Sequence, residues 1–293
     1  RRALLPGQER IDRDSSWAAE QGYLAHFALS DIDSGIFFYD ERLARGAAGL
    51  AGAEGEPEFQ VWLEDWRVSQ TGIGQYSLFA RGNSFQIDLQ LIEQKPLVFH
   101  GESGYSQKGA DPGNASYYIS MTRLAAIGEV KMESGLFAVE GLSWMDHEYS
   151  TSALDDRQVG WDWFSLQLDD DSEIMVYTLR REDGSIDPFS GGTLIRPDGS
   201  TRTVKVDEFV IEANGSWQSP HSGAIYPAGW LLEIPSEGIT LRIEPLLADQ
   251  ELRVSFIYWE GAVQASGTAG GRNITGFGYV ELTGYAQSMQ RRF

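Results

Sequence analysis

The chain of 293 residues contains no cysteine. Without thiols it can form no disulfide, no thiol nucleophile and no cysteine-based metal site. A protein of this composition is compatible with a reducing cytosol and with a bacterial periplasm, so cysteine usage leaves the compartment open. The chemistry of any site must come from carboxyl, imidazole, hydroxyl, amino and aromatic groups.

Basic residues and long apolar runs are also scarce. There are 23 Lys and Arg against 43 Asp and Glu, which gives a formal net charge of -20. This charge repels phosphate backbones and removes the counterion release that drives nucleic-acid binding, so we expect no nucleic-acid partner. No apolar run approaches the about 20 residues needed to cross a bilayer, so we expect no integral membrane segment. The sequence does not indicate an oligomeric state.

Helical patterns are few, whereas short alternating segments follow one another along the chain. In Ser84–Ile92, apolar residues alternate with polar ones, which is typical of a strand with one buried face. Segments 22–29 and 35–39 flank an acidic turn and predict a hairpin. The Ala-rich segment 41–52 is one of few helix candidates. The pattern as a whole predicts an all-β chain, in which strands this short and evenly spaced favour barrels or sandwiches.

The length exceeds the usual single-domain size of roughly 100–200 residues, so we expect two domains. The best boundary candidate is the polar segment Asp155–Gln158. Two segments, HFALSDIDSGIFFYDERLARG and FSLQLDDDSEIMVYTLRREDG, share one pattern. In each, a strand is followed by an acidic turn, a strand that ends in aromatic residues, and charged residues that include arginine. Acidic hairpins are common, so this similarity leaves a duplicated domain as an open alternative.

The stretch from Gly141 to Leu168 gathers carboxyl groups, an imidazole and tryptophans near the middle of the chain, the mixture from which buried acid/base sites are built. On a regular strand Trp144, Asp146 and Glu148 share one face, whereas Met145, His147 and Tyr149 share the other. The side chains of the two faces could line one pocket only if a bulge redirected one of them. If the strand passed between two barrels, each face could line a different cavity. The alternative is an ion pair at a strand end with ordinary aromatic packing.

Other candidate groups are dispersed. Three of the four histidines, His26, His100 and His147, could ligate zinc with a nearby carboxylate, but their spacing matches no compact motif, so we expect no metal. The Gly-rich segment 99–109 lacks the spacing of a phosphate-binding loop and the context of a nucleophilic serine, which favours a long turn. Arg123 either pairs with a central carboxylate or forms a surface salt bridge. Nine tryptophans and twelve tyrosines exceed what two cores require, so some are expected to line a cavity.

Six elements of the sequence, in this order, resemble the AttH/CrtC family: FHGESGYSQKG, SYYISMTRL, GLSWMDHEYS, GWDWFSLQLDD, YWEGAV and GFGYVELTGY. This family includes AttH-like proteins and the carotenoid 1,2-hydratases, or hydroxyneurosporene synthases. The resemblance implies two lipocalin-like β-barrel domains, residues 1–152 and 153–293, and a periplasmic or secreted location. Family members usually begin with a Trp-Tyr strand and an F-x-x-T-F-F-R strand, of which only the trailing Arg-Arg remains, so we expect the first barrel to lack strands.

The resemblance to the hydratases also implies a mechanism in which an aromatic-lined site near the domain junction binds a hydrophobic molecule, such as an isoprenoid or polyene, without a cofactor. A protonated Asp146 would donate a proton to a C=C bond, and His147 or Glu148 would orient the attacking water. Two alternatives stay open, a non-catalytic lipocalin-like carrier and a secreted hydrolase. The residues expected to bind the ligand, the first four by stabilising cationic charge, are Trp144, Tyr149, Trp161, Trp163, His100, Tyr118 and Arg123.

Overall fold

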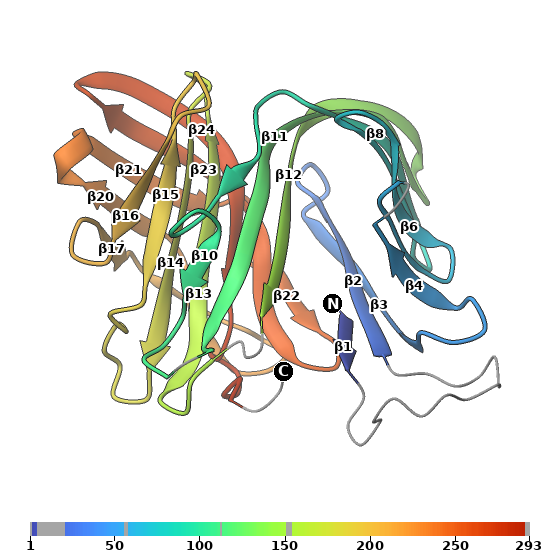
Figure 1. Ribbon diagram of the computed structural model, residues 1–293, viewed down its shortest axis with the longest axis horizontal. Coiled ribbons are helices and arrows are strands. Elements are labelled where there is room, and N and C mark those ends of the chain that lie inside the picture. The colour runs from blue at the N-terminus through green and yellow to red at the C-terminus, as the bar shows by residue number, and fades with distance from the viewer. Residues whose placement is uncertain (1, 5–20, 56–57, 112, 151–153, 291–293) are drawn as a thin grey trace. The chain divides into compact units, whose positions relative to one another are not determined.

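A computed structural model describes residues 2–4, 21–55, 58–111, 113–150 and 154–290 (Figure 1). Over these residues the secondary structure consists of strands, with a single turn of 3-10 helix at Pro235–Glu237. The prediction of an all-β chain is therefore confirmed. None of the described residues lies in a helix long and apolar enough to cross a membrane.

The chain divides into two compact units, each made of separate segments. The first unit comprises Arg1–Leu29, Phe37–Gln94 and Arg123–Ser143, and the second comprises Ser30–Ile36, Lys95–Thr122 and Trp144–Phe293. The predicted boundary between residues 152 and 153 lies outside the described residues, so it stays a prediction. The residues that matter most for the candidate site all belong to the second unit.

Two sheets contain the strands of the first unit. One has the strand order β1-β2-β3, which agrees with the predicted hairpin. The other has the order β10-β11-β8-β7-β6-β5-β4, with β12 and β9 also paired to β11, and its strands β9 and β10 and parts of β11 and β12 belong to the second unit. The alternating segment 84–92 forms β8, where Phe85 and Leu91 are buried and Asp88 is exposed. The bounds of these strands are β1 Arg2–Leu4, β2 Gln21–Asp31, β3 Ile36–Arg45, β4 Ala51–Glu54, β5 Gln60–Leu63, β6 Trp66–Gly72, β7 Gln75–Arg81, β8 Phe85–Glu93, β9 Val98–Phe99, β10 Tyr105–Gln107, β11 Ala115–Met132 and β12 Gly135–Ser150.

The helix predicted over residues 41–52 is wrong. Strand β3 continues to Arg45, a turn follows in which Ala48 and Gly49 have φ of +50° and +73°, and β4 begins at Ala51. Ala51 pairs with Leu63, and both are buried. The alanine propensity for helix amounts to only a few tenths of a kcal/mol per residue, so strand pairing and burial override it.

The second unit contains a large antiparallel sheet with the order β16-β15-β14-β13-β24-β23-β21-β20-β17, in which β22 also pairs with β23 (Figure 1). The described pairings do not join β16 to β17 and so do not close the sheet, and the lipocalin-like barrel stays a prediction. A two-stranded sheet, β18-β19, accompanies it. The bounds are β13 Gln158–Leu168, β14 Glu173–Arg181, β15 Gly191–Ile195, β16 Thr201–Lys205, β17 Val210–Ala213, β18 Ser216–Gln218, β19 Ile225–Pro227, β20 Trp230–Ile234, β21 Ile239–Pro245, β22 Glu251–Arg253, β23 Ile257–Ala269 and β24 Arg272–Leu282.

Both faces of β13 and β14 are covered. On one face Phe164 and Val176 belong to the main core, which the large buried rings of Trp230, Trp259 and Tyr226 help to fill. On the other face is a smaller cluster of buried and half-buried apolar residues, Trp161, Trp163, Met175, Tyr177 and Leu179, which packs with Tyr118 and Trp144. The main core thus covers the first face, and the candidate site lies on the second face.

Candidate functional site

The carboxyl group of Asp146 is the centre of the candidate site. Strand β12 places Trp144, Asp146 and Glu148 on one face, as the alternation predicts. Oδ1 of Asp146 accepts hydrogen bonds from the indole N–H of Trp144 at 2.6 Å and from the hydroxyl of Ser120 at 2.5 Å. Oδ2 accepts one from the hydroxyl of Tyr118 at 2.6 Å. Three donors on two neighbouring strands therefore fix the orientation of this carboxyl group.

Indole rings border the same carboxyl group. The indole N–H of Trp163, on β13, donates to the hydroxyl oxygen of Tyr118 at 2.9 Å. The rings of Trp144 and Trp163 meet edge to face, with centroids 6.4 Å apart. Asp146 keeps solvent-accessible surface, so a small molecule can approach a carboxyl group that is otherwise surrounded by aromatic side chains.

His100 joins the carboxyl network to strand β15. Its Nε2 lies 2.8 Å from Oγ of Ser120, and its Nδ1 lies 2.8 Å from Oγ1 of Thr193. The imidazole also packs against the ring of Tyr118, with centroids 4.3 Å apart. Burial, with a smaller contribution from the charge of Lys108, lowers the pKa of His100 to about 3. The imidazole is therefore neutral at neutral pH.

An ion pair lies on the same face as Asp146. Nζ of Lys108 is 3.2 Å from Oε1 of Glu148, which also accepts a hydrogen bond from Ser116 at 2.5 Å. The ammonium group lies over the ring of Tyr177, 4.0 Å from its centroid. Although burial alone would lower it, the pKa of Lys108 is raised by Tyr177 and Glu148. Lys108 thus stays charged beside Glu148.

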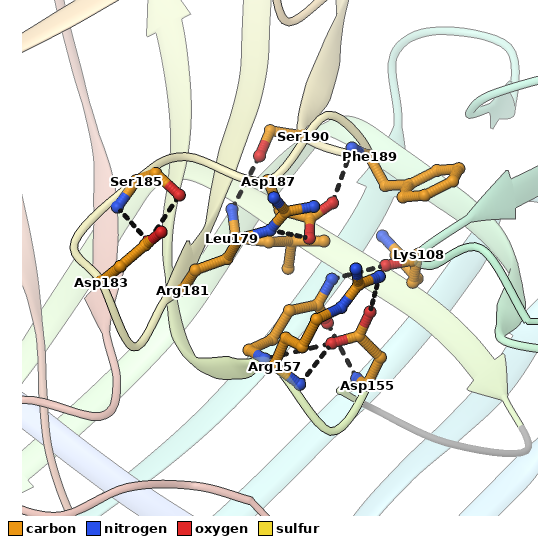
Figure 2. A network of polar contacts seen from close by, with 11 residues as sticks. Lys108, Asp155, Arg157, Leu179, Arg181, Asp183, Ser185, Asp187, Phe189 and Ser190 are labelled. Atoms are coloured by element: carbon orange, nitrogen blue, oxygen red, sulfur yellow. Dashed lines mark hydrogen bonds and ion pairs between the residues drawn. The ribbon is translucent and has the colours of Figure 1, made fainter.

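A second network holds the loop that carries Lys108 (Figure 2). The carbonyl oxygen of Lys108 accepts a hydrogen bond from the side chain of Gln158 at 2.8 Å, and Oδ1 of Asp155 accepts from the backbone N–H of Gln158 at 3.1 Å. Close by, the fully buried carboxyl of Asp187 pairs with Arg181 at 2.8 Å. The hydrogen bond from Gln158 holds the backbone of this loop at Lys108.

The surroundings of Asp146 favour its protonated form. Removal from water is the main cause that raises the pKa of Asp146, and the charge of Glu148 adds to it, whereas the hydrogen bonds from Ser120, Tyr118 and Trp144 oppose it. Because the side chain still reaches solvent, the increase is smaller than complete burial would produce. The pKa of Tyr118 is raised well above its ordinary value by burial and by Asp146, so its hydroxyl remains a donor.

A cavity of about 440 Å³ lies beside this network, between the segment around His100 and strands β14 to β16. His100 and Thr193 line it together with Ser106, Tyr177 and Lys205. Its walls combine hydroxyl and charged groups with apolar side chains. Thr193 and His100 therefore separate the cavity from the hydrogen bonds of Asp146.

The remaining predicted residues are distributed differently. His147 and Tyr149 lie on the opposite face of β12 from Asp146, with ring centroids 5.5 Å apart, and Tyr149 stacks on Tyr117. Trp161 packs in the apolar cluster beside Trp163. Arg123 is buried in the first unit, and strand alternation places it on the opposite face of β11 from Ser120. The structure therefore brings together Trp144, Asp146, Glu148, Trp163, His100 and Tyr118.

The profile of one protein family, described as AttH-like, matches residues 1–285. The chain belongs to the AttH-like family. A crystal structure assigned to AttH from Nitrosomonas europaea has a TM-score of 0.84 and 34% identity, and the match covers 93% of this chain and 83% of that one. The resemblance seen in the sequence is thereby confirmed.

Two further relatives of this AttH-like chain are hydratases. Kievitone hydratase from Fusarium solani subsp. phaseoli is 22% identical over 224 residues, which are 73% of this chain and 61% of that protein. The chain thus spans about three fifths of the length of that relative. The crystal structure of kievitone hydratase from Nectria haematococca has a TM-score of 0.72 at 14% identity, over 91% of this chain and 80% of that one. At this identity the structural likeness concerns the fold alone.

The sequence pattern of this family member does not single out several of the residues in the candidate site. Ser116 and Ser120 carry a weak signal, because polar residues recur at every second position of the segment SYYISMT. Lys108 and Thr193 carry none, since they lie in a Gly-rich turn and a short buried strand. Over the described ranges, no three or more His, Asp or Glu side chains come together in a way that could hold a metal ion.

Proposed function

We propose that this AttH-like protein binds a hydrophobic small molecule beside Asp146 and adds water across one of its C=C bonds by acid catalysis. The observation that supports this proposal best is the carboxyl group of Asp146. Its pKa is raised, and it is oriented by three donors and bordered by the indole rings of Trp144 and Trp163. Protonation of an alkene needs such a group, because a carboxyl with a raised pKa can stay protonated until it meets its substrate.

In the proposed reaction Asp146 donates its proton to the less substituted alkene carbon, and a tertiary carbocation forms at the other. The faces of Trp144 and Trp163 stabilise this cation, an effect worth about 0.5–2 kcal/mol per ring. Water attacks the cation, and a carboxylate accepts the proton that the water loses. Glu148 is the better candidate for this base than His147, because it lies on the face of β12 that carries Asp146.

The sequence comparison supports the reaction class, because a relative that is 22% identical is named kievitone hydratase. The structural likeness to a second kievitone hydratase supports the fold. The substrate of the present chain is not carried over from them. A lipocalin-like barrel around the ligand and a periplasmic or secreted location are part of the same proposal, and the lack of cysteine is compatible with that location.

The test incubates the protein with kievitone and with a panel of acyclic isoprenoids in detergent, followed by mass spectrometry for products heavier by one water. The matched variants are D146N and, as a control of the same chemistry at an exposed position, D88N. We expect product from the wild type and from D88N and none from D146N. Equal product from D146N would overturn the acid role.

Absence of product from every variant would overturn hydration of these compounds and favour a carrier. In a carrier the carboxyl group has no chemical task. The D146N variant would then bind the hydrophobic ligands with nearly the affinity of the wild type, which tryptophan fluorescence quenching can measure.

A further inference from the structure

Four groups form an unbroken hydrogen-bonded chain from the cavity to the carboxyl of Asp146. Oγ1 of Thr193 lies 2.8 Å from Nδ1 of His100, Nε2 of His100 lies 2.8 Å from Oγ of Ser120, and that oxygen lies 2.5 Å from Oδ1 of Asp146. Thr193, His100 and Ser120 are each 1% exposed. Solvent therefore reaches this chain of groups at its two ends, the cavity and the open side of Asp146.

The ionised form of Asp146 fixes the direction of every bond in the chain. The carboxylate can only accept, so Ser120 donates its hydroxyl proton to Oδ1. The oxygen of Ser120 is then the acceptor for Nε2–H of His100. The imidazole is neutral, so Nδ1 carries a lone pair and accepts from the hydroxyl of Thr193. The ionised carboxylate thus requires the Nε2–H tautomer.

The relay can accommodate a proton on Oδ1. In the ionised carboxyl group Oδ1 accepts hydrogen bonds from Ser120 and from Trp144. A proton on the lone pair that faces Ser120 reverses each bond toward Thr193, while the other lone pair still accepts from Trp144. Every group of the relay therefore keeps a partner.

We propose that Thr193, His100 and Ser120 form a proton relay between the cavity and Oδ1 of Asp146. A proton that enters from water in the cavity binds Oγ1 of Thr193, whose own proton moves to Nδ1 of His100. The Nε2 proton moves to Ser120, and the Ser120 proton moves to Oδ1. The hydroxyl oxygens of Thr193 and Ser120 each gain one proton and lose one. The imidazole gains a proton at Nδ1 and loses one at Nε2, so it changes to the Nδ1–H tautomer without becoming charged.

The relay would return protons to the acid of the proposed hydration reaction. The purpose of the relay rests on that proposed function, whereas its hydrogen bonds do not. A bound hydrophobic molecule covers the open side of Asp146, so a second route is needed to restore the acid while the site is occupied. The charged and titratable groups around the relay are Lys108, Glu148, Tyr118 and Tyr177, and Lys205 and Asp207 line the cavity at its other end. The ammonium of Lys108 opposes an imidazolium at His100, which favours transfer through the neutral ring.

The test follows the tautomer of His100 by two-bond ¹H–¹⁵N correlation spectra of ¹⁵N-histidine protein without any substrate. The protein is titrated from neutral pH toward about pH 4, just above the reference pKa of aspartic acid, with added salt because the sequence pI is about 4.5. We expect Nε2–H at neutral pH, and a change to Nδ1–H at the same pH at which the ¹³C signal of the Asp146 carboxyl titrates. Circular dichroism at each pH shows that the fold persists.

Three variants control the experiment. S120A cuts the relay beside Asp146 and T193V cuts it at the cavity, so in both the tautomer should no longer follow the carboxyl titration. S106A removes a buried hydroxyl that lines the same cavity and lies 3.4 Å from the hydroxyl of Tyr177, outside the relay, and should behave as the wild type. H100Q assigns the signal among the four histidines.

An Nδ1–H tautomer at neutral pH, an imidazolium in place of a neutral change, or a constant tautomer while Asp146 titrates would each overturn the relay. None of these results depends on turnover. A failed search for hydration products would therefore leave the relay standing, and a failed tautomer change would leave the hydratase proposal to its own test.

Discussion

Tyr118 donates its hydroxyl proton to Oδ2 of Asp146 at 2.6 Å, and this bond links the two strands that carry the candidate site. Tyr118 is 2% exposed. The pKa of its hydroxyl is raised well above the ordinary value, first by burial and then by the charge of Asp146. The tyrosine thus remains a neutral donor over the working pH range and stabilises the ionised form of the carboxyl.

Replacing Tyr118 with phenylalanine should raise the pKa of Asp146 further, because the carboxylate loses a donor that opposes desolvation. It should also lower the free energy of unfolding by about 1.5–3 kcal/mol, the range for a hydrogen bond to a charged group. Carboxyl ¹³C titration and urea unfolding measure the two effects. Y117F is the matched control, since Tyr117 is 53% exposed on the opposite face of the strand. A lower pKa in Y118F would contradict the assignment.

The raised pKa of Asp146 predicts how stability depends on pH. A group with a higher pKa in the folded state binds more protons there than in the unfolded state, so its contribution to stability falls as the pH rises. The decline should begin near the pKa of Asp146 in the unfolded state, for which 3.8 is the reference, and end above its pKa in the folded state. Urea unfolding at several pH values should show wild-type stability falling relative to D146N across this window. If the stabilities of the wild type and D146N changed with pH in parallel, a raised pKa of Asp146 would be excluded.

Removing the charge of Lys108 should destabilise the second unit. Its side chain is 10% exposed, whereas that of its partner Glu148 is 39% exposed and can recover hydration. The cost in K108M should therefore be about 1–2 kcal/mol, below the range for a fully buried pair that loses one partner. The double variant with E148Q should recover part of this loss, since no uncompensated carboxylate then remains.

Thermal and urea unfolding of K108M, E148Q and the double variant provide this cycle. K131M is the matched control, because Lys131 is exposed on β11 in the first unit. Strictly additive losses in the double variant would show that Lys108 and Glu148 do not interact, and Lys108 would then contribute through packing on Tyr177 alone.

The sequence predicts the elements whose pattern is local. Alternation over residues 84–92 gives a strand with a buried face because the period of two is a property of the strand itself. The same rule puts Trp144 and Asp146 on one face, and their hydrogen bond agrees with it. The helix predicted over residues 41–52 fails because the partner strand that outweighs alanine propensity is not visible in that segment.

The candidate site is predicted only in part for a related reason. Asp146 stands out among aromatic residues in the sequence, but its partners Ser120 and Tyr118 are more than 25 residues away on another strand. Thr193 is 93 residues from His100, and no spacing rule connects them. Register and the packing of one strand on another create these contacts, so they emerge only with the fold.

The ion pair of Asp162 and Arg180 should stabilise the second unit more than the pair of Lys108 and Glu148 does. Nε of Arg180 lies 2.9 Å from Oδ1 of Asp162, whose Oδ2 accepts from Tyr285 at 2.9 Å, and the guanidinium covers the Tyr285 ring. R180M leaves a buried carboxylate without its cation, which costs about 3–5 kcal/mol, whereas Y285F removes one hydrogen bond and should cost about 1–3 kcal/mol. Urea unfolding ranks them, with R196M at an exposed position as control. A loss in R180M no larger than in R196M would show that the ion pair contributes nothing to stability.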